Sequence, residues 1–212
     1  YLYVQINSDA SWSCQSGQNG GPAIDADYYC SSIAVGGCTD PTASNYDNAA
    51  TVDDGTCIPA NDDYVNAELV ACGASITAST VSASTGANAL SSGMDIWYQF
   101  IGTGDNVTVS LCGSSFDTYL EIYDDASSVL IASNDDNFTA CGSGGNSYLT
   151  FASLVGVDYR IKVEGYFSTG SGAVALDLTC TPISGCTDPA ATNYNALANF
   201  FIVMYVKNWP KK

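Results

Sequence analysis

The chain has 212 residues, of which 22 are Asp or Glu and only five are Lys or Arg, so its formal net charge is -17. It contains no His, which excludes Ser-His-Asp and Cys-His catalysis, His-ligated metals and His-based pH switching. The negative charge argues against nucleic-acid partners and against anionic membrane surfaces, because both would repel the chain.

The acidic residues are almost all Asp, and only Glu68, Glu121 and Glu164 are Glu. Asp favours turns and ligates calcium, whereas Glu favours helices. Together with 20 Gly and 14 Tyr, this composition favours short strands joined by polar turns. A hydrophobic content of 46% is that of a folded protein, so the sequence predicts an all-β fold rather than a disordered acidic chain.

Nine cysteines are scattered along the chain and none forms a Cys-x-x-Cys motif, which argues against a zinc ribbon or a thioredoxin-like site. Structural disulfides are the alternative, and they imply an oxidising location, extracellular or on the cell surface. Pairing each cysteine by its context predicts four bonds: Cys14–Cys30, Cys38–Cys57, Cys72–Cys180 and Cys112–Cys141. Cys186 is left over, so it has a missing partner, an intermolecular bond or a free thiol.

The first segment, residues 1–36, begins with a run of β-forming residues at Tyr1–Asn7 and contains the Cys14–Cys30 pair. The main domain predicted further along the chain does not need this strand. An unpaired strand is an adhesive edge, so we expect Tyr1–Asn7 to pair with another strand, in the same chain or in a second copy.

Residues 37–59 and 185–199 form an internal repeat. The first copy begins GCTDPTASNYDNAATVDDGTC and the second reads GCTDPAATNYNALAN, with Gly-Cys-Thr-Asp-Pro, Ala and Asn-Tyr at identical offsets. The second copy lacks the Asp-Asp-Gly-Thr-Cys ending of the first, so Cys186 has lost the counterpart of Cys57. The repeat predicts two small disulfide-bounded modules, of which the second is partial.

The block between the repeats, residues 60–182, contains eight strand-like runs separated by turn signals. The runs are Ser75–Ser84, Asp95–Ile101, Asn106–Cys112, Thr118–Tyr123, Val129–Ser133, Ser147–Phe151, Tyr159–Glu164 and Ala173–Thr179. Eight strands in this length predict a jelly-roll-like antiparallel β-sandwich. An immunoglobulin-type sandwich is the alternative, but its Cys-Trp-Cys spacing is absent. A weak helical periodicity spans Ala60–Ala71.

The block contains NDD at 61–63, IWYQF at 96–100, NVTVS at 106–110, FDTYLEIY at 116–123, NDD at 134–136 and YRIKV at 159–163. With this pattern, residues 61–180 resemble the bacterial pre-peptidase C-terminal domain, a β-sandwich often appended to secreted peptidases and surface proteins. The stretch FDTYLEIYDD is also similar to the CUB domain, another extracellular sandwich, whose corresponding Asp can ligate calcium. The GCTDP segments resemble short cysteine-bounded repeats of secreted bacterial proteins.

Calcium is the cation that these acidic turns favour, because it takes six to eight oxygen ligands and relieves repulsion between crowded carboxylates. Asp117 precedes one predicted strand, Asp124 follows that strand, and Asp135 and Asp136 follow the next. If the two strands are antiparallel neighbours, their ends bring several of these acids together, and we expect a calcium site there. The alternative is that each Asp only fills a turn on an acidic surface.

A second, smaller calcium site is expected in the first repeat, where Asp53 and Asp54 stand directly before Gly55, with Asp40 and Asp47 upstream. It is not an EF-hand, since the Asp-x-Asp-x-Asp-Gly ladder and the terminal Glu are missing. The alternative of solvated turn acids applies to these residues as well.

No catalytic constellation stands out, so the sequence predicts no enzymatic activity. Nothing marks one carboxylate as the acid and another as the base of a glycosidase, and the G-x-S-x-G motif is absent. Two Asn-x-Thr sequons make Asn106 and Asn137 candidate glycosylation sites. Asn137 stands in a turn-rich stretch and is expected to be the more exposed of the two.

The C-terminal segment, residues 200–212, opens with Phe200–Val206, a run that is apolar on both faces of a strand. We expect this run either to fold against Tyr1–Asn7 or to enter the sheet of another copy, and exchange of this kind from head to tail makes an open filament. The sequence therefore predicts a structural subunit of an extracellular fibre or surface assembly, stabilised by calcium and disulfides. The alternative is an accessory module of a secreted bacterial hydrolase that binds glycans or proteins.

Overall fold

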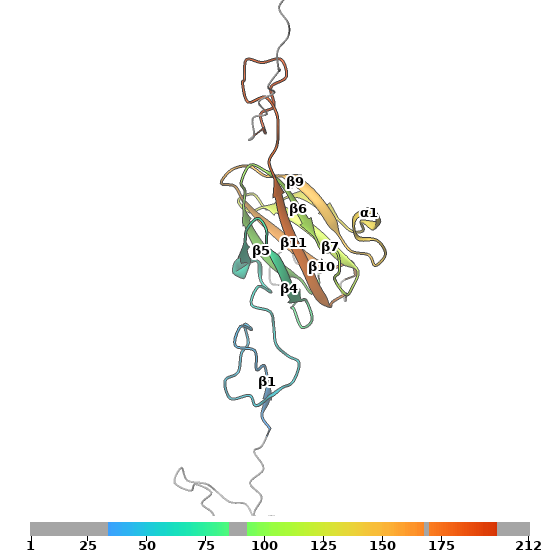
Figure 1. Cartoon of the computed structure of the whole chain (residues 1–212). Helices are drawn as coiled ribbons and strands as arrows, with labels where there is room; N and C mark the ends of the chain where they lie inside the picture. Colours follow the sequence, from blue (N-terminus) through green and yellow to red (C-terminus); the bar gives the residue numbers. More distant parts are fainter. Residues whose placement is uncertain (1–33, 85–92, 168–169, 199–212) are drawn as a thin grey trace, which may run out of the picture.

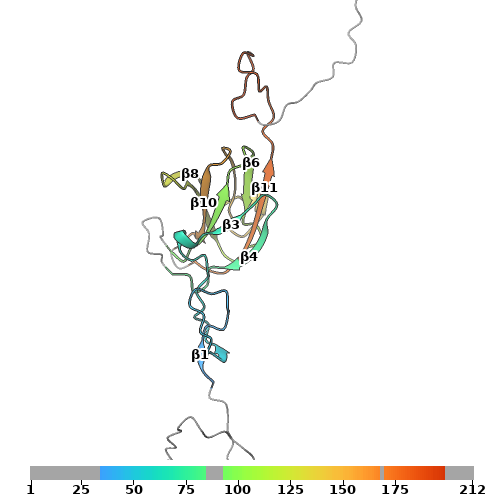
Figure 2. The ribbon, with the colours of Figure 1, turned by 90° about the vertical axis from the view of Figure 1, so that its left-hand side faces the viewer.

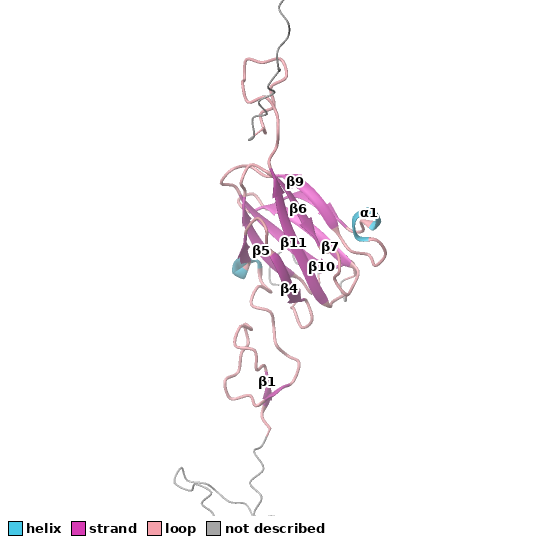
Figure 3. Ribbon diagram, viewed as in Figure 1, coloured by secondary structure: helices cyan, strands magenta, loops and turns pink. Residues whose placement is uncertain are grey.

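The computed structural model of the chain describes residues 34–84, 93–167 and 170–198. The strands expected at Tyr1–Asn7 and Phe200–Val206 and the Cys14–Cys30 pair lie outside the described residues. The described part is almost entirely β, as predicted, with one short α-helix and one 3-10 turn (Figure 3). No helix in it is long and apolar enough to cross a membrane.

The described elements fall into a small first module and a central sandwich. The first module, residues 35–58, contains β1 (Gly36–Gly37) and β2 (Val52–Asp53), which pair in parallel. The sandwich contains η1 (Tyr64–Asn66), β3 (Glu68–Val70), β4 (Ser75–Ser79), β5 (Ile96–Ile101), β6 (Asn106–Ser110), β7 (Thr118–Asp124), β8 (Val129–Asn134), α1 (Phe138–Cys141), β9 (Tyr148–Ala152), β10 (Asp158–Gly165) and β11 (Ala173–Thr181).

The sandwich consists of two sheets, with strand orders β3-β5-β10-β7-β8 and β4-β11-β6-β9 (Figure 1). The strands form four antiparallel pairs: β4·β11, β5·β10, β6·β9 and β7·β8. Together these pairs make one long two-stranded hairpin ribbon, whose turn lies between β7 and β8. Rolling this ribbon brings β10 beside β7 and β11 beside β6. This pairing is that of a jelly roll, as predicted, and not that of an immunoglobulin-type sandwich.

All eight predicted strands are present, with shifted ends. The largest shift is in β4, which ends at Ser79 rather than Ser84 because the chain turns there, with Ser82 at a φ of +67°. The weak helical periodicity over Ala60–Ala71 does not mark an α-helix, because this stretch contains only the 3-10 turn η1 and the strand β3. Parallel pairing with β5 satisfies the backbone groups on one edge of β3, whereas a lone short helix in water is marginal.

The core lies between the two sheets and follows the alternation along the strands. Ile96, Tyr98 and Phe100 of β5 belong to it, and so do Ile161 and Val163 of β10. None of these five side chains is more than 1% exposed. Burial of each large apolar side chain contributes roughly 1.5–3 kcal/mol, which makes this interlayer the main source of stability.

The outer face of the five-stranded sheet is also covered in part. Trp97 is fully buried yet does not belong to the interlayer core, and its ring packs edge-on against Tyr64 of η1 with centroids 5.3 Å apart. Beside it, the Lys162 ammonium is 1% exposed and lies 3.1 Å from Glu121 and 2.9 Å from Glu164. Two of the three Glu residues thus neutralise one buried cation.

Three disulfides fasten the described part of the chain: Cys38–Cys57, Cys72–Cys180 and Cys112–Cys141. They are the pairs that the sequence predicts for this part, and Cys186 is a free thiol. Cys72 and Cys180 are 108 residues apart, so in the loop-entropy account their bond restricts the unfolded chain most, by about 4–5 kcal/mol. Bonds of this kind persist in an oxidising compartment, outside the cytoplasm.

Two modules flank the sandwich at opposite ends, as Figure 1 and Figure 2 both show. The first module and the second module, residues 183–198, repeat the same backbone hydrogen bonds at a constant offset of 148 residues. Asp47 N donates to the Cys38 carbonyl at 2.9 Å in one, and Asn195 N donates to the Cys186 carbonyl at 2.9 Å in the other. The repeated motif is therefore a repeated local fold.

Candidate metal centre

One end of the β7–β8 hairpin carries three carboxylates. Asp117 stands directly before β7, and Asp135 and Asp136 directly follow β8. Because the strands are antiparallel, with Leu120 opposite Asn134, the start of β7 lies beside the end of β8. One oxygen from each carboxylate lies within 4.8 Å of the other two. This spacing is compatible with one shared cation.

A loop that contains glycine passes beside these carboxylates. Gly145 has a φ of +67°, and a Cβ placed there would lie 2.7 Å from Asp117 Oδ1, so only glycine lets the backbone come this close. Asn146 fastens the loop by donating from Nδ2, at 2.9 Å, to the carbonyl of the residue before Asp117. Ser147 Oγ lies 2.7 Å from the Asp135 carbonyl. The loop therefore fixes the backbone on both sides of the cluster.

The electrostatics of the cluster favour a cation. Burial, followed by repulsion from Asp136, raises the pKa of Asp117 above its usual value. Burial also raises the pKa of Asp135, with further repulsion from Asp136 and Asp117. In addition, Asp135 Oδ1 is buried and has no hydrogen-bond partner within the part of the chain that the structure describes. A bound cation would supply both the missing charge and the missing contact.

Asp124 does not join this cluster, contrary to the expectation from the sequence. It lies at the other end of β7, opposite Val129, and the ends of a seven-residue strand are about 20 Å apart. Its Oδ1 accepts the Ser127 backbone N–H at 2.8 Å, and the hydroxyl and the backbone N–H of Ser127 lower its pKa. The next acid, Asp125, pairs with Arg160 at 2.9 Å. Antiparallel pairing thus separates acids that are close in sequence.

The acids of the first module do not form the second site that the sequence suggests. Asp53 Oδ1 and Asp54 Oδ1 each accept the backbone N–H of the residue two positions further on, at 2.9 and 3.1 Å, so each fills its own turn. Neither belongs to a metal-compatible group of three side chains within the described ranges. A group formed by Cys72, Asp105 and Cys180 is also no metal site, because its two sulfurs are bonded to each other.

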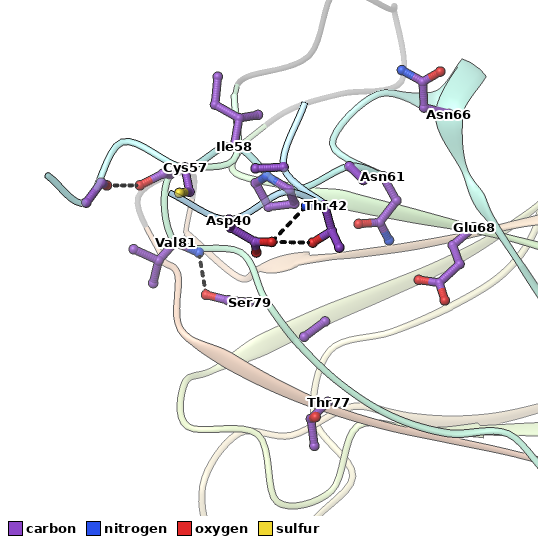
Figure 4. A pocket seen from close by; sticks show the side chains of 16 residues that line it. Asp40, Thr42, Cys57, Ile58, Asn61, Asn66, Glu68, Thr77, Ser79 and Val81 are labelled. Atoms are coloured by element: carbon purple, nitrogen blue, oxygen red, sulfur yellow. Dashed lines mark hydrogen bonds between the residues drawn. The ribbon is translucent and has the colours of Figure 1, made fainter. Parts of the chain in front are cut away.

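A groove of about 780 Å³ lies between the first module and the sandwich (Figure 4). Asp40 comes from the module, Glu68 from β3, and Thr77 and Ser79 from β4, which among the described strands pairs with β11 alone. The hydroxyl and the backbone N–H of Thr42 both donate to Asp40 Oδ1, at 2.7 and 2.8 Å, and lower the pKa of Asp40. Among the described residues, the lining contains no aromatic ring and no Lys or Arg, so it suits an extended peptide better than a stacked sugar ring.

The two sequons lie in folded elements. Asn106 is half-buried at the start of β6. Asn137 caps α1, where its Oδ1 accepts the Ala140 N–H at 3.1 Å and its Nδ2 donates to the Tyr148 carbonyl at 3.1 Å. The expected greater exposure of Asn137 is not seen, since both are half-buried and the nitrogen that would carry a glycan already has a partner.

Comparison with known proteins assigns no family, since no family model and no curated protein sequence matches the chain. Two solved structures are similar to part of it. One is the pre-peptidase C-terminal domain of a collagenase from Bacillus anthracis, at 16% identity and a TM-score of 0.39, covering 53% of this chain and 94% of that one. The other is PliG from Aeromonas hydrophila, a periplasmic inhibitor of g-type lysozyme, at 12% identity and a TM-score of 0.36, covering 56% and 99%. The jelly-roll assignment rests on the strand pairing.

Proposed function

We propose that the chain is a non-catalytic structural subunit of an extracellular or cell-surface assembly, fastened by disulfides and by calcium. The observation that carries this proposal is the placement of two modules of one local fold at opposite ends of a jelly roll (Figure 1). A subunit with two distinct ends can associate head to tail, and repetition of that contact builds an open chain. In this proposal the buried Lys162–Glu121–Glu164 group has a structural role.

The contact between subunits is proposed to be strand donation by Tyr1–Asn7, by Phe200–Val206 or by both. The proposed acceptor is β4, which within the described residues is paired on one side only. Burying one large apolar side chain contributes roughly 1.5–3 kcal/mol, so several of them offset the roughly 4–15 kcal/mol that association costs. The charge of -17 opposes close approach, and bound calcium or added salt would weaken that repulsion.

Calcium is proposed to bind at Asp117, Asp135 and Asp136. Three carboxylates offer up to six oxygens, and calcium accepts six to eight oxygen ligands from carboxylates, carbonyls and water. The raised pKa values of Asp117 and Asp135 support the proposal, because crowded and partly buried carboxylates gain most from a divalent ion. Calcium would fix the end of the β7–β8 hairpin rather than take part in a reaction.

Sedimentation velocity over a range of concentrations and negative-stain microscopy test the assembly. The intact chain is expected to form filaments, and deletion of residues 1–7, or separately of residues 200–212, is expected to leave folded monomers. Circular dichroism is the control for folding. Filaments of unchanged length from both deletions would contradict strand donation, and an intact chain that stays monomeric at high concentration would contradict the structural role itself.

A second candidate function is that of a binding module in a larger secreted protein, and the groove beside β4 favours it. The groove offers two carboxylates, several hydroxyls and a free strand edge, which suit an extended, positively charged peptide. Panning a peptide library against the full chain would test this function, with Thr77→Trp to fill the groove and Ser127→Trp, at the β7–β8 turn, as the matched control. Binding that survives Thr77→Trp would contradict it. A glycan and peptide hydrolysis screen tests the expected absence of catalysis.

A further inference from the structure

The first module is closed by its own last residues, 51–58, here called the closing segment. The Cys38–Cys57 disulfide attaches this segment covalently, and the Gly37 carbonyl accepts a backbone N–H from it at 3.3 Å. Asn45 holds it from two sides: Nδ2 donates to one carbonyl of the segment at 2.7 Å, and Oδ1 accepts one of its N–H groups at 2.8 Å. Closure leaves Cys38 only 2% exposed.

The second module keeps the groups that hold a closing segment. At the offset of 148 residues, Gly185, Cys186 and Asn193 stand where Gly37, Cys38 and Asn45 stand in the first module. The framework around them is the same, because the bond from Thr42 N to Asp40 Oδ1 at 2.8 Å recurs from Ala190 N to Asp188 Oδ1 at 2.9 Å. The receiving groups are therefore held in the arrangement that is occupied in the first module.

These receiving groups lack their partners. Cys186 is a free thiol and half-buried, whereas its counterpart Cys38 is bonded and buried. Asn193 is exposed, and its side chain makes no hydrogen bond with any described residue, whereas Asn45 makes two with the closing segment. A free cysteine alone would be weak evidence, but here the same three residues bind the same kind of segment elsewhere in the chain.

The stretch that follows the second module in sequence does not match a closing segment. The offset places the counterpart of residues 51–58 at residues 199–206, which read NFFIVMYV and contain no Asp, Gly or Cys. Position 205, the counterpart of Cys57, is Tyr. Residues 199–206 therefore do not supply a closing segment for the second module.

We propose that the second module is a docking site for a closing segment supplied by another polypeptide, of the type aliphatic-Asp-Asp-Gly-Thr-Cys, whose cysteine bonds to Cys186. The inference rests on the proposed structural function and names one joint of the assembly. The closing segment of a neighbouring first module is not the donor, because taking it would open one module to close another. The partner is therefore a chain with a segment of this chemistry whose cysteine is held in an exchangeable mixed disulfide.

The bond forms by thiol–disulfide exchange, which needs no further oxidant. The Cys186 thiolate attacks the cysteine sulfur of an incoming segment that carries a mixed disulfide. A new S–S bond forms between the two chains, the original S–S bond breaks, and the second thiol leaves as a thiolate that takes up a proton. The disulfide count is unchanged. Asn193 then holds the segment as Asn45 does in the first module.

The probe is the synthetic octapeptide TVDDGTCI, residues 51–58 of this chain, with its cysteine activated as a mixed disulfide with thionitrobenzoate. It is added to the full-length protein, and release of the coloured thiolate is followed by absorbance and by intact mass. Glutathione activated in the same way measures the intrinsic reactivity of the thiol. We expect the octapeptide to react at least tenfold faster than activated glutathione, and Cys186→Ser to abolish both reactions.

Two variants separate docking from simple thiol reactivity. Asn193→Ala should reduce the preference for the octapeptide by about tenfold, since it removes two hydrogen bonds of the kind that Asn45 makes, while its rate with activated glutathione stays unchanged. Thr187→Ala is the matched control, because Thr187 is exposed next to Cys186 and its counterpart Thr39 makes no side-chain hydrogen bond to the closing segment among the described contacts. It should keep the full preference.

Several results would overturn the docking site. They are equal rates for the octapeptide and activated glutathione, a preference that Asn193→Ala does not change, or a purified protein in which Cys186 is already bonded to Cys14, to Cys30 or to Cys186 of a second copy. The proposed function is tested separately. If filaments form but the octapeptide is not captured selectively, the structural role stands and the docking site is refuted. If the octapeptide is captured but the chain never assembles, the docking site stands and the structural role is refuted.

Discussion

The calcium site makes the sharpest prediction about stability. An extracellular site built from a few carboxylates typically binds calcium with a dissociation constant of about 10⁻⁴ M. At roughly 10 mM calcium, a hundredfold excess over that constant, binding to the folded state alone stabilises it by about 2.7 kcal/mol. For a sandwich of this size, that corresponds to a rise of about 10 °C in the melting temperature.

The double variant Asp117→Asn with Asp136→Asn should lose this shift while the sandwich stays folded. It removes two of the three carboxylates that lie within 4.8 Å of one another, and with them the repulsion that adds to burial in raising the pKa of Asp135. Without calcium the variant should therefore melt no lower than the unmodified chain. Asp124→Asn is the matched control, because it changes an Asp of the same hairpin at the opposite end.

Differential scanning calorimetry with calcium and with a chelator measures the shift. Acidification supplies a second readout. The pKa values of Asp117 and Asp135 are raised in the folded state, so without calcium the destabilisation they cause is present above those pKa values and fades as the pH falls through them. Calcium stabilisation should fade over the same range, because protons compete for the ligands. Superimposable melts of the unmodified chain with calcium and with chelator would refute the site.

Other predictions follow from single contacts. Non-reducing peptide mapping should recover Cys38–Cys57, Cys72–Cys180 and Cys112–Cys141, and a Cys72–Cys112 peptide would disprove the bond that closes the sandwich. Lys162→Met should lower the free energy of unfolding, measured in urea, by roughly 3–5 kcal/mol, because it leaves Glu121 and Glu164 buried without their cation. A loss below about 1 kcal/mol would mean that water reaches the two carboxylates. Gly145→Ala should cost about 1–3 kcal/mol and weaken the calcium shift, since its Cβ would meet Asp117 Oδ1, whereas Gly156→Ala, with a similar φ but open space, should cost less and leave the shift unchanged.

The sequence by itself determined the elements that depend on local chemistry. Runs of β-forming residues between turn signals marked all eight predicted strands, because strand-forming and turn-forming residues act locally. The repeat fixed the two modules, since equal side chains at equal offsets make equal turns, as the bonds of Asp40 and Asp188 show. The disulfide pairs of the described part also followed from cysteine context.

Only the tertiary structure decided which acids meet. Asp117, Asp124 and Asp135 look equivalent in sequence, but antiparallel pairing puts the start of β7 beside the end of β8 and sends Asp124 to the far end. The same holds for β3, whose strand conformation depends on an edge of β5 rather than on its own periodicity. Strand pairing and register are long-range properties of the folded chain, set by which edges remain open after the ribbon has rolled up, and no local pattern in the sequence records them.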